Sequence, residues 1–402
     1  MRDFFRQTLI FAASMLLALF LVVIVLSMGI SALQKAEQPK LTANSVLRIV
    51  LEGDVKEHNP HRNIPLLLQQ NASPTIALNT LKEAIKAAKG DARIRGILLE
   101  AKELSVGWAS LQEIREALLD FKQAGKFVIA CGDSYSLKTY YLAALSDEIF
   151  LHPEGIFRFN GMSKTVMFYQ SLLEKLSIKP QILRVGKYKS FTEPFTRQDM
   201  SPANRKQCTA LIENIYEHIL QHIGEGRKLA PAALRKGADD LSVAIPANAC
   251  KMGLVSRLGY YSDVEKEINT RLGTPLDAAI HHIDFARYAS LQKPHRARQD
   301  KITVIVAEGR IQHGKGQHGT ISSAPFVKLL RAAREDRTIK GVVLRINSPG
   351  GSALASDILW QEIKRLREVK PVVASMADVA ASGGYYMAAA CNHITAQHIT
   401  IT

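Results

Sequence analysis

A serine followed by two glycines, Ser382-Gly383-Gly384, is the stretch best suited to nucleophilic chemistry. It follows an apolar run at 371–374, typical of a buried strand, and a small-residue turn at 378–381. The composition after it favours a helix. A serine at a strand-to-helix turn lies beside free N–H groups that stabilise developing negative charge. The glycines leave room for a substrate backbone. The alternative is that Ser382 is only an N-cap.

A second glycine pair, Gly350-Gly351, lies upstream in the stretch NSPGGS at 347–352. The backbone N–H of Gly350 or Gly351, together with that of Gly383, could hold the oxyanion of a tetrahedral intermediate. Loss of one such donor typically costs about 3–4 kcal/mol of transition-state stabilisation.

Lys189 is the candidate general base, in a segment that is rich in aromatic residues. Tyr188, Phe191 and Phe195 flank it. An apolar setting disfavours the ammonium form and would prepare the amine to accept a proton. Lys187 is its closest rival, and a simply solvated lysine is the alternative.

Alternating strand and helix patterns predict an α/β fold with mostly parallel strands. The predicted strands are 46–53, 96–99 and 127–130, and the predicted helices are 78–89, 110–122 and 138–145.

The sequence contains an internal duplication. Gly341 lies 245 residues after Gly96, and the same spacing relates Asp133 to Asp378 and Tyr140-Tyr141 to Tyr385-Tyr386. Searching for such periods early prevents a wrong fold assignment. The copies differ where chemistry is expected, since 102–107 (KELSVG) replaces NSPGGS and 137–139 (LKT) replaces SGG. We therefore expect one active copy and one that has lost its site.

An uncharged apolar stretch, 8–30, is long enough to cross the roughly 30 Å hydrocarbon core of a bilayer as a helix. Arg2 and Arg6 precede it and predict a cytoplasmic N-terminus. A cleaved signal peptide is the alternative. The predicted organisation is a cytoplasmic N-terminus 1–7, an anchor 8–30, a spacer 31–44, a first repeat 45–272, a linker 273–300 and a second repeat 301–402.

The second repeat stops early, just after a strand that is expected near 394–401. By analogy with the first, whose span continues from Ile149 to Leu272, we expect more than 100 further residues in a complete protein.

The formal net charge of +15 indicates an anionic neighbour. The positive residues are dispersed and form no known nucleic-acid signature, so we expect a lipid surface and no nucleic acid. Four widely separated cysteines, Cys131, Cys208, Cys250 and Cys391, predict neither a metal site nor a disulfide framework.

These features together resemble the long, duplicated form of the signal peptide peptidase SppA family, also called protease IV. The resemblance rests on the N-terminal anchor, the YKS-EPF segment at 188–195, DMSP at 199–202, RINSPGGS at 345–352 and AASGGYY at 380–386. The strand-NSPGG-helix unit also resembles Clp proteases and, more weakly, crotonases.

The resemblance implies a tandem duplication of a Clp protease/crotonase-like unit and a serine-lysine peptidase. Ser382 would be the nucleophile and Lys189 the base, with no metal or organic cofactor. It also implies peptide substrates that are remnant signal peptides, a homotetramer, and a catalytic part on the periplasmic side of the bacterial inner membrane. The ending at 393–398 departs from the usual Asn-Pro-containing stretch of the family.

Other interpretations remain open at this point. His393 or His398 could belong to a Ser-His-Asp triad, and a crotonase-like acyl-CoA enzyme would use the glycine oxyanion hole without a nucleophilic serine. His313 and His318 could bind metal, although a flexible glycine loop is the simpler reading. An inactive membrane scaffold is the non-enzyme alternative.

Overall fold

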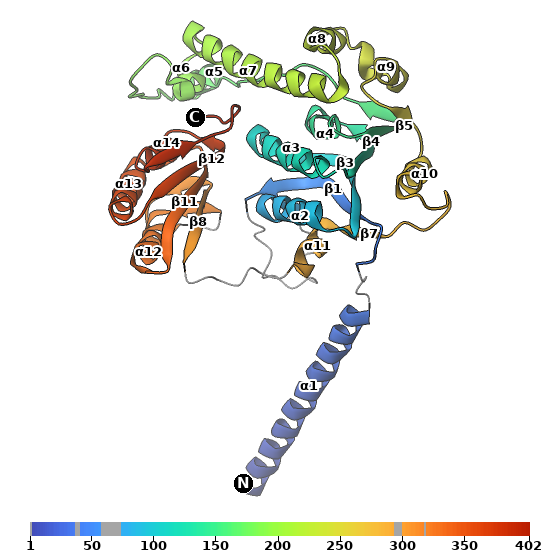
Figure 1. The fold of residues 1–402 in the computed structure, drawn as a ribbon. Coiled ribbons are helices and arrows are strands. Elements are labelled where there is room, and N and C mark those ends of the chain that lie inside the picture. Colours follow the sequence, from blue (N-terminus) through green and yellow to red (C-terminus); the bar gives the residue numbers. More distant parts are fainter. Residues whose placement is uncertain (1, 37–40, 58–73, 293–299, 317–318) are drawn as a thin grey trace. The chain divides into compact units, whose positions relative to one another are not determined.

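The computed structural model describes residues 2–36, 41–57, 74–292, 300–316 and 319–402. Two units are distinguished, Met1–Ala43 and Asn44–Thr402. The first contains the helix α1, Arg2–Ala36 (Figure 1). Within α1, Arg6–Val25 is long and apolar enough to cross a membrane, as judged by length and composition alone.

The second unit begins with a seven-stranded sheet in which all neighbouring strands are parallel. Its order is β2-β1-β3-β4-β5-β6, and β7 also pairs with β1. The predicted parallel α/β architecture is thus confirmed. The strands are β1 Ser45–Lys56, β2 Thr75–Ala77, β3 Ile94–Ser105, β4 Phe127–Tyr135, β5 Glu148–Phe157, β6 Arg257–Leu258 and β7 His282–Asp284.

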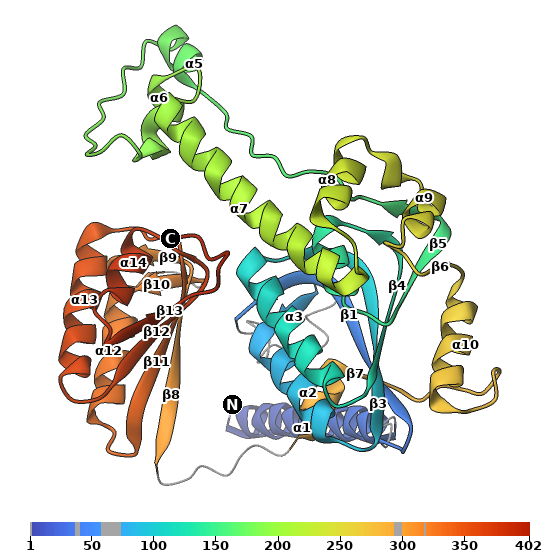
Figure 2. The same ribbon diagram turned by 45° about the horizontal axis from the view of Figure 1, so that its top comes forward.

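Helices pack on this sheet because its central strands are apolar on both faces. On one face, α10 (Tyr261–Leu272) places Val264 and Ile268 against Leu98 and Ile129. Successive side chains of a strand point to opposite faces, so Ile97 lies on the side away from α10. The helices α2 (Leu78–Gly90) and α3 (Trp108–Lys122) pack side by side, as Figure 2 shows.

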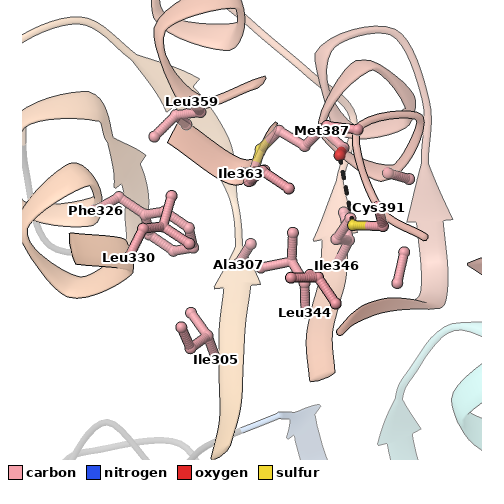
Figure 3. Close-up of a cluster of buried hydrophobic side chains, with 14 of the residues drawn as sticks. Ile305, Ala307, Phe326, Leu330, Leu344, Ile346, Leu359, Ile363, Met387 and Cys391 are labelled. Carbon is pink, nitrogen blue, oxygen red and sulfur yellow. Dashed lines mark hydrogen bonds between the residues drawn. The ribbon is translucent and has the colours of Figure 1, made fainter. Parts of the chain in front are cut away.

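A second parallel sheet, of order β13-β12-β11-β8, is accompanied by the short pair β9 and β10. Its apolar core includes Leu344 and Ile346 from β11, Leu359 and Ile363 from α13, and Met387 from α14 (Figure 3). The elements are β8 Lys301–Glu308, β9 Arg310–Gln312, β10 Thr320–Ser322, α12 Ser323–Glu335, β11 Ile339–Ser348, α13 Ala353–Arg367, β12 Val372–Ala380, α14 Gly383–Ala388 and β13 His393–Thr395.

The two sheets confirm the predicted duplication. A spacing of 245 residues superimposes the printed bounds of α2 on α12, of α3 on α13 and of β4 on β12. At the start of the copies the spacing is 256 residues, and it superimposes β1 on the combined range of β8 and β9. Gly53 and Gly309 occupy the same place in this longer strand, and both have positive φ, 81° and 103°. The difference between the two spacings falls between β1 and β2, where the first copy has the longer connection.

A buried ion network joins the two copies. Arg345 on β11 donates to Glu57 at 2.8 Å and to Glu113 on α3 at 2.6 Å. The side chains of Glu57 and Glu113 are only 1% and 8% exposed. In the first copy Glu100 stands at the position of Arg345, and it pairs with Arg48 of its own sheet. At this position the glutamate of the first copy forms an ion pair within its own copy. The arginine of the second copy instead forms ion pairs with glutamates of the first copy.

The region between the copies is divided into several separate helices. Prolines begin α7, α8 and α9, which is the position where a missing backbone N–H costs nothing. The helices are α4 Leu137–Ala143, α5 Gln170–Lys175, α6 Glu193–Thr196, α7 Pro202–Arg227, α8 Pro231–Asp239, α9 Pro246–Lys251 and α11 Phe285–Leu291, with the short 3-10 turns η2 Ser190–Thr192 and η3 Ser242–Ala244.

Three sequence expectations about local structure need correction. The stretch 273–300 contributes β7 and α11, and β7 joins the first sheet through β1, so its described part is more than a linker. The turn expected at 378–381 is mostly strand, because β12 continues to Ala380. The strand expected at 394–401 is only β13, after which Ile401 bridges to Val379.

Candidate active site

Ser382 lies between β12 and α14 in an unusual backbone conformation, with φ 52° and ψ −116°. Positive φ is uncommon for a residue other than glycine, and such strain costs roughly 1–3 kcal/mol. Ser382 is exposed and makes no side-chain capping bond to α14. Ser382 therefore occupies the N-cap position of α14, but its side chain does not cap the helix.

The first copy makes the same turn without strain. There Ser136 precedes α4 with φ −82° and ψ 165°, and forms a capping box with Thr139. Leu137 occupies the position that corresponds to Ser382. Because the same fold can close this turn with an ordinary cap, the strain at Ser382 is a property of the second copy alone. Strain confined in this way is typical of functional sites.

Hydrogen bonds from neighbouring segments hold the turn. The N–H of Ala381 donates to the carbonyl of Ser348 at 3.0 Å, and that of Ala380 donates to Ile401 at 2.8 Å. The N–H of Val379 donates to Oδ1 of Asn347 at 3.2 Å. The residues Asn347 and Ser348 of the NSPGGS stretch thus position the backbone that leads to Ser382.

Gly350 packs directly beside the nucleophile turn, with φ +90°. A β-carbon at this position would lie 2.5 Å from the amide nitrogen of Gly383. The N–H of Gly350 donates to Oγ of Ser348 at 3.1 Å, so it is already engaged. Gly351 is exposed and forms a parallel bridge with Ile311. The hydrogen bonds of this bridge are made by the carbonyl of Gly350 and the N–H of Ser352. The N–H of Gly351 therefore points away from Ile311.

The glycines after Ser382 are needed for packing. A β-carbon on Gly383 would lie 2.4 Å from Oγ of Ser356, and one on Gly384 would lie 2.6 Å from the carbonyl oxygen of Ser348. We expected these glycines to clear a path for substrate. The structure shows instead that they let α14 approach α13 and β11 closely. Gly383 also begins α14, where the N–H has no partner within the helix.

Lys189 lies immediately before η2, and its side chain is exposed. The aromatic residues that were expected to surround it are exposed as well, Tyr188 by 46%, Phe191 by 82% and Phe195 by 39%. In the described part of the chain they do not form a closed apolar pocket around Lys189. No hydrogen bond connects Lys189 with Ser382 among the described residues.

Glu193 is the residue of this segment that sequence reasoning missed. It is fully buried and accepts hydrogen bonds from Oγ and N–H of Ser201, at 2.5 and 3.1 Å, and from Nδ2 of Asn204 at 2.9 Å. Glu193 therefore ties the lysine segment to the N-terminus of α7. An acidic residue upstream of the helix-starting pair Ser201-Pro202 was the available signal.

The histidines considered for a Ser-His-Asp triad, His393 and His398, lie on the surface of the second copy. His393 and His398 are exposed, and neither has a hydrogen bond to Ser382 in the described residues. The His398 ring lies 6.0 Å from that of His218 on α7. No metal-binding group of three side chains occurs among the described residues. His313 is exposed, and His318 lies outside the described residues.

Comparisons with known proteins show to which family the chain belongs. The family model of peptidase family S49 matches residues 120–274 and 364–402. Protease 4 of Salmonella typhi is 34% identical over 421 aligned residues, which cover 99% of this chain and 68% of that protein. This chain belongs to peptidase family S49.

Another member of peptidase family S49 gives a similar match. The chloroplastic serine protease SPPA of Arabidopsis thaliana is 34% identical over 90% of this chain and 53% of its own length. The chain therefore spans about half to two thirds of the curated relatives that it matches. A solved structure of a 1510-N membrane-bound stomatin-specific protease variant is similar at TM-score 0.33 and 11% identity, over 60% of this chain and 98% of that one.

Proposed function

We propose that this chain is the part of a membrane-anchored serine peptidase that carries a Ser-Lys dyad, with Ser382 as the nucleophile and Lys189 as the base. The observation that supports it most is that Ser382 is exposed, has a strained backbone and lies beside Gly350, in the second copy alone. Membership of peptidase family S49 supports the same reaction class.

The proposed reaction requires few groups. The uncharged amine of Lys189 accepts the proton of the Ser382 hydroxyl while Oγ attacks the peptide carbonyl. The N–H groups of Gly351 and Gly383 stabilise the resulting oxyanion, and Gly350 shapes the turn between them. The proton then passes to the leaving amine, and water hydrolyses the acyl-enzyme with the same base.

The exposure of Lys189 has a direct consequence for this proposal. An exposed lysine side chain is not held by protein against the hydroxyl whose proton it must accept. We infer that Lys189 and its aromatic neighbours are enclosed by further protein in the working enzyme. A homotetramer, which the resemblance to the SppA family implies, would supply such surface.

The predicted anchor and the domain organisation also support a proposal about where in the cell the enzyme acts. A span within α1 would hold the enzyme in the bacterial inner membrane as a single-pass protein, with both copies on the periplasmic side. Peptides released into that membrane, namely remnant signal peptides, are the proposed substrates. Residues 45–272 would supply the base and residues 301–402 the nucleophile.

A fluorophosphonate probe tests the proposal on the full chain in detergent micelles. The probe should modify the wild-type chain at Ser382, identified by peptide mass spectrometry, and should not modify Ser382→Ala. Ser136→Ala is the matched control, because Ser136 caps the equivalent helix of the first copy. Equal labelling of Ser382→Ala and wild type, or no labelling of a folded wild-type chain, would overturn the proposal in favour of a crotonase-like or scaffold role.

A further inference from the structure

A carboxylate of the second copy caps a helix of the first. Oδ1 of Asp378 on β12 accepts a hydrogen bond from the N–H of Ser110 at 2.8 Å, and Oδ2 accepts one from the Ser110 hydroxyl at 2.6 Å. Ser110 is the third residue of α3, and it is 3% exposed. A carboxylate at this end of a helix also interacts favourably with the helix dipole. The contact therefore combines two charge-assisted hydrogen bonds with a favourable field.

The first copy is shaped to receive this carboxylate. The residue before α3 is Gly107, which has no side chain to cap the helix. A β-carbon on Gly107 would lie 2.0 Å from Cγ of Asp378, so any larger residue would displace the carboxylate. At the same position of the second copy, Ser352 caps its own helix, since its Oγ accepts from the N–H of Ala355 at 3.3 Å. The first copy thus uses Asp378 where the second uses its own serine.

The lost active site of the first copy contributes a positive charge here. Lys138 occupies the position that corresponds to Gly383, and its amine donates to the carbonyl of Val106, the counterpart of Gly351, at 2.7 Å. The first copy therefore joins by a lysine hydrogen bond the two positions at which the second copy has Gly351 and Gly383. The charge of Lys138 also interacts favourably with Asp378.

Asp378 is connected to the nucleophile through the backbone of β12. Its own carbonyl accepts from the N–H of Ile401 at 2.9 Å, and the N–H of Ala380 donates back to Ile401 at 2.8 Å. Only three residues separate Asp378 from Ser382. Fixing the Asp378 side chain to α3 therefore fixes the end of the strand from which the strained turn departs.

We propose that Asp378 is a positioning residue and that the first copy, besides supplying the base, acts as a clamp that holds the nucleophile turn through Ser110 and Gly107. This inference rests on the proposed peptidase function. The inference gives a role to the region of the first copy that corresponds to the candidate active site. In this role the first copy positions the Ser382 turn without touching a reacting atom. Asp133, the counterpart of Asp378 in the first copy, is exposed and provides a matched comparison.

The test measures how fast the fluorophosphonate probe modifies Ser382 in the full chain, over a range of probe concentrations. For Asp378→Asn, Asp378→Ala and Ser110→Ala we expect the maximal rate to fall between about tenfold and a hundredfold, because small displacements of a reacting group have effects of this size. The probe concentration at half-maximal rate should stay unchanged, because the clamp does not contact the probe. Asp133→Asn should behave as wild type.

A stability control separates positioning from general weakening. Lys370→Met removes a buried amine that donates to the carbonyls of Ala333 and Asp336, both at 2.6 Å, and should lower the melting temperature with little change in maximal rate. The double variant Ser110→Ala/Asp378→Ala should be no slower than Asp378→Ala alone, because both changes break one contact.

Each failure can be recognised. Wild-type maximal rates in the folded Asp378 and Ser110 variants, or losses no greater than that of Lys370→Met at equal melting temperature, would overturn the clamp while leaving the peptidase proposal intact. If the wild-type chain itself were not labelled, the peptidase proposal would fail first and the clamp with it. Should Asp378→Ala not fold, Asp378→Asn and Ser110→Ala decide the question.

Discussion

Gly350 and Ser382 lie so close together that a β-carbon added to Gly350 would stand 2.8 Å from the β-carbon of Ser382. Real β-carbons essentially never approach other heavy atoms this closely. The oxyanion side and the nucleophile side of the candidate site are therefore one packed unit, and neither can move without the other.

Gly350→Ala should accordingly displace the turn that carries Ser382. We expect labelling of Ser382 by a fluorophosphonate to slow by about a hundredfold or more, since a shift of about 1 Å has effects of that order. Gly314→Ala is the matched control, because Gly314 also has positive φ, 82°, but has open space around it. The positive φ should strain the backbone of both variants by roughly 1–2 kcal/mol. Gly350→Ala should lose more stability in melting experiments, because its β-carbon also meets backbone atoms. Similar labelling rates in the two variants would contradict the packed-unit interpretation.

Lys189→Ala should abolish most turnover in the complete enzyme. Loss of a general base typically costs about 100- to 10,000-fold in rate, and we expect that loss in kcat for peptide cleavage. Lys187→Ala is the control, because Lys187 is equally exposed and its amine lies over the ring of Tyr188 at 5.3 Å. If Lys187→Ala were inactive while Lys189→Ala retained near wild-type turnover, the assignment of the base would be wrong.

Arg345→Met should strongly destabilise the contact between the copies. Removing one partner of a buried ion network leaves Glu57 and Glu113 without their shared cation, which typically costs about 3–5 kcal/mol. Arg331→Met removes a half-exposed arginine that pairs with Glu362, and should cost much less, because water screens an exposed pair. Urea denaturation of the two variants measures the difference. Equal losses of unfolding free energy would show that the network contributes nothing special.

The Arg345→Met penalty should also depend on pH. Burial already raises the pKa of Glu57 above its ordinary value, while Arg345 lowers it. Without the arginine the folded-state pKa rises further, so the folded variant binds a proton that the unfolded chain has released. Stability of the variant should therefore decrease as pH rises above the unfolded value of about 4.5 through the raised folded value. A penalty that grew on acidification would contradict this sign.

His218→Gln should make the protein less sensitive to acid. Burial, together with the positive charge of His222 and His398, lowers the pKa of His218 to about 4. Arg115 also lowers this pKa, whereas Glu225 raises it. The unfolded chain takes up a proton near pH 6.5, before the folded chain does, so this residue destabilises the fold as pH falls from about 6.5 to about 4. Melting temperatures over that range should decrease less in His218→Gln than in wild type. His281→Gln, at an exposed histidine, should match wild type.

The sequence was sufficient for features that depend on local chemistry. Apolar runs and helix periodicity predict the alternating parallel fold, and the spacing of 245 residues predicts two copies of one unit. The position of Ser382 at a strand-to-helix turn follows from the same pattern, as do Gly350 and Gly351 at the end of the neighbouring strand. These features are predictable because each depends on residues close together in the chain.

The tertiary structure decided everything that depends on residues far apart. Asn347, Ser348 and Ile401 form hydrogen bonds with the strand that leads to the strained residue Ser382. The partnership of Asp378 with Ser110 spans 268 residues and that of Arg345 with Glu57 spans 288, distances over which no local pattern carries information. The aromatic residues around Lys189 illustrate the converse, because apolar composition predicts burial only where a second surface is present to provide it.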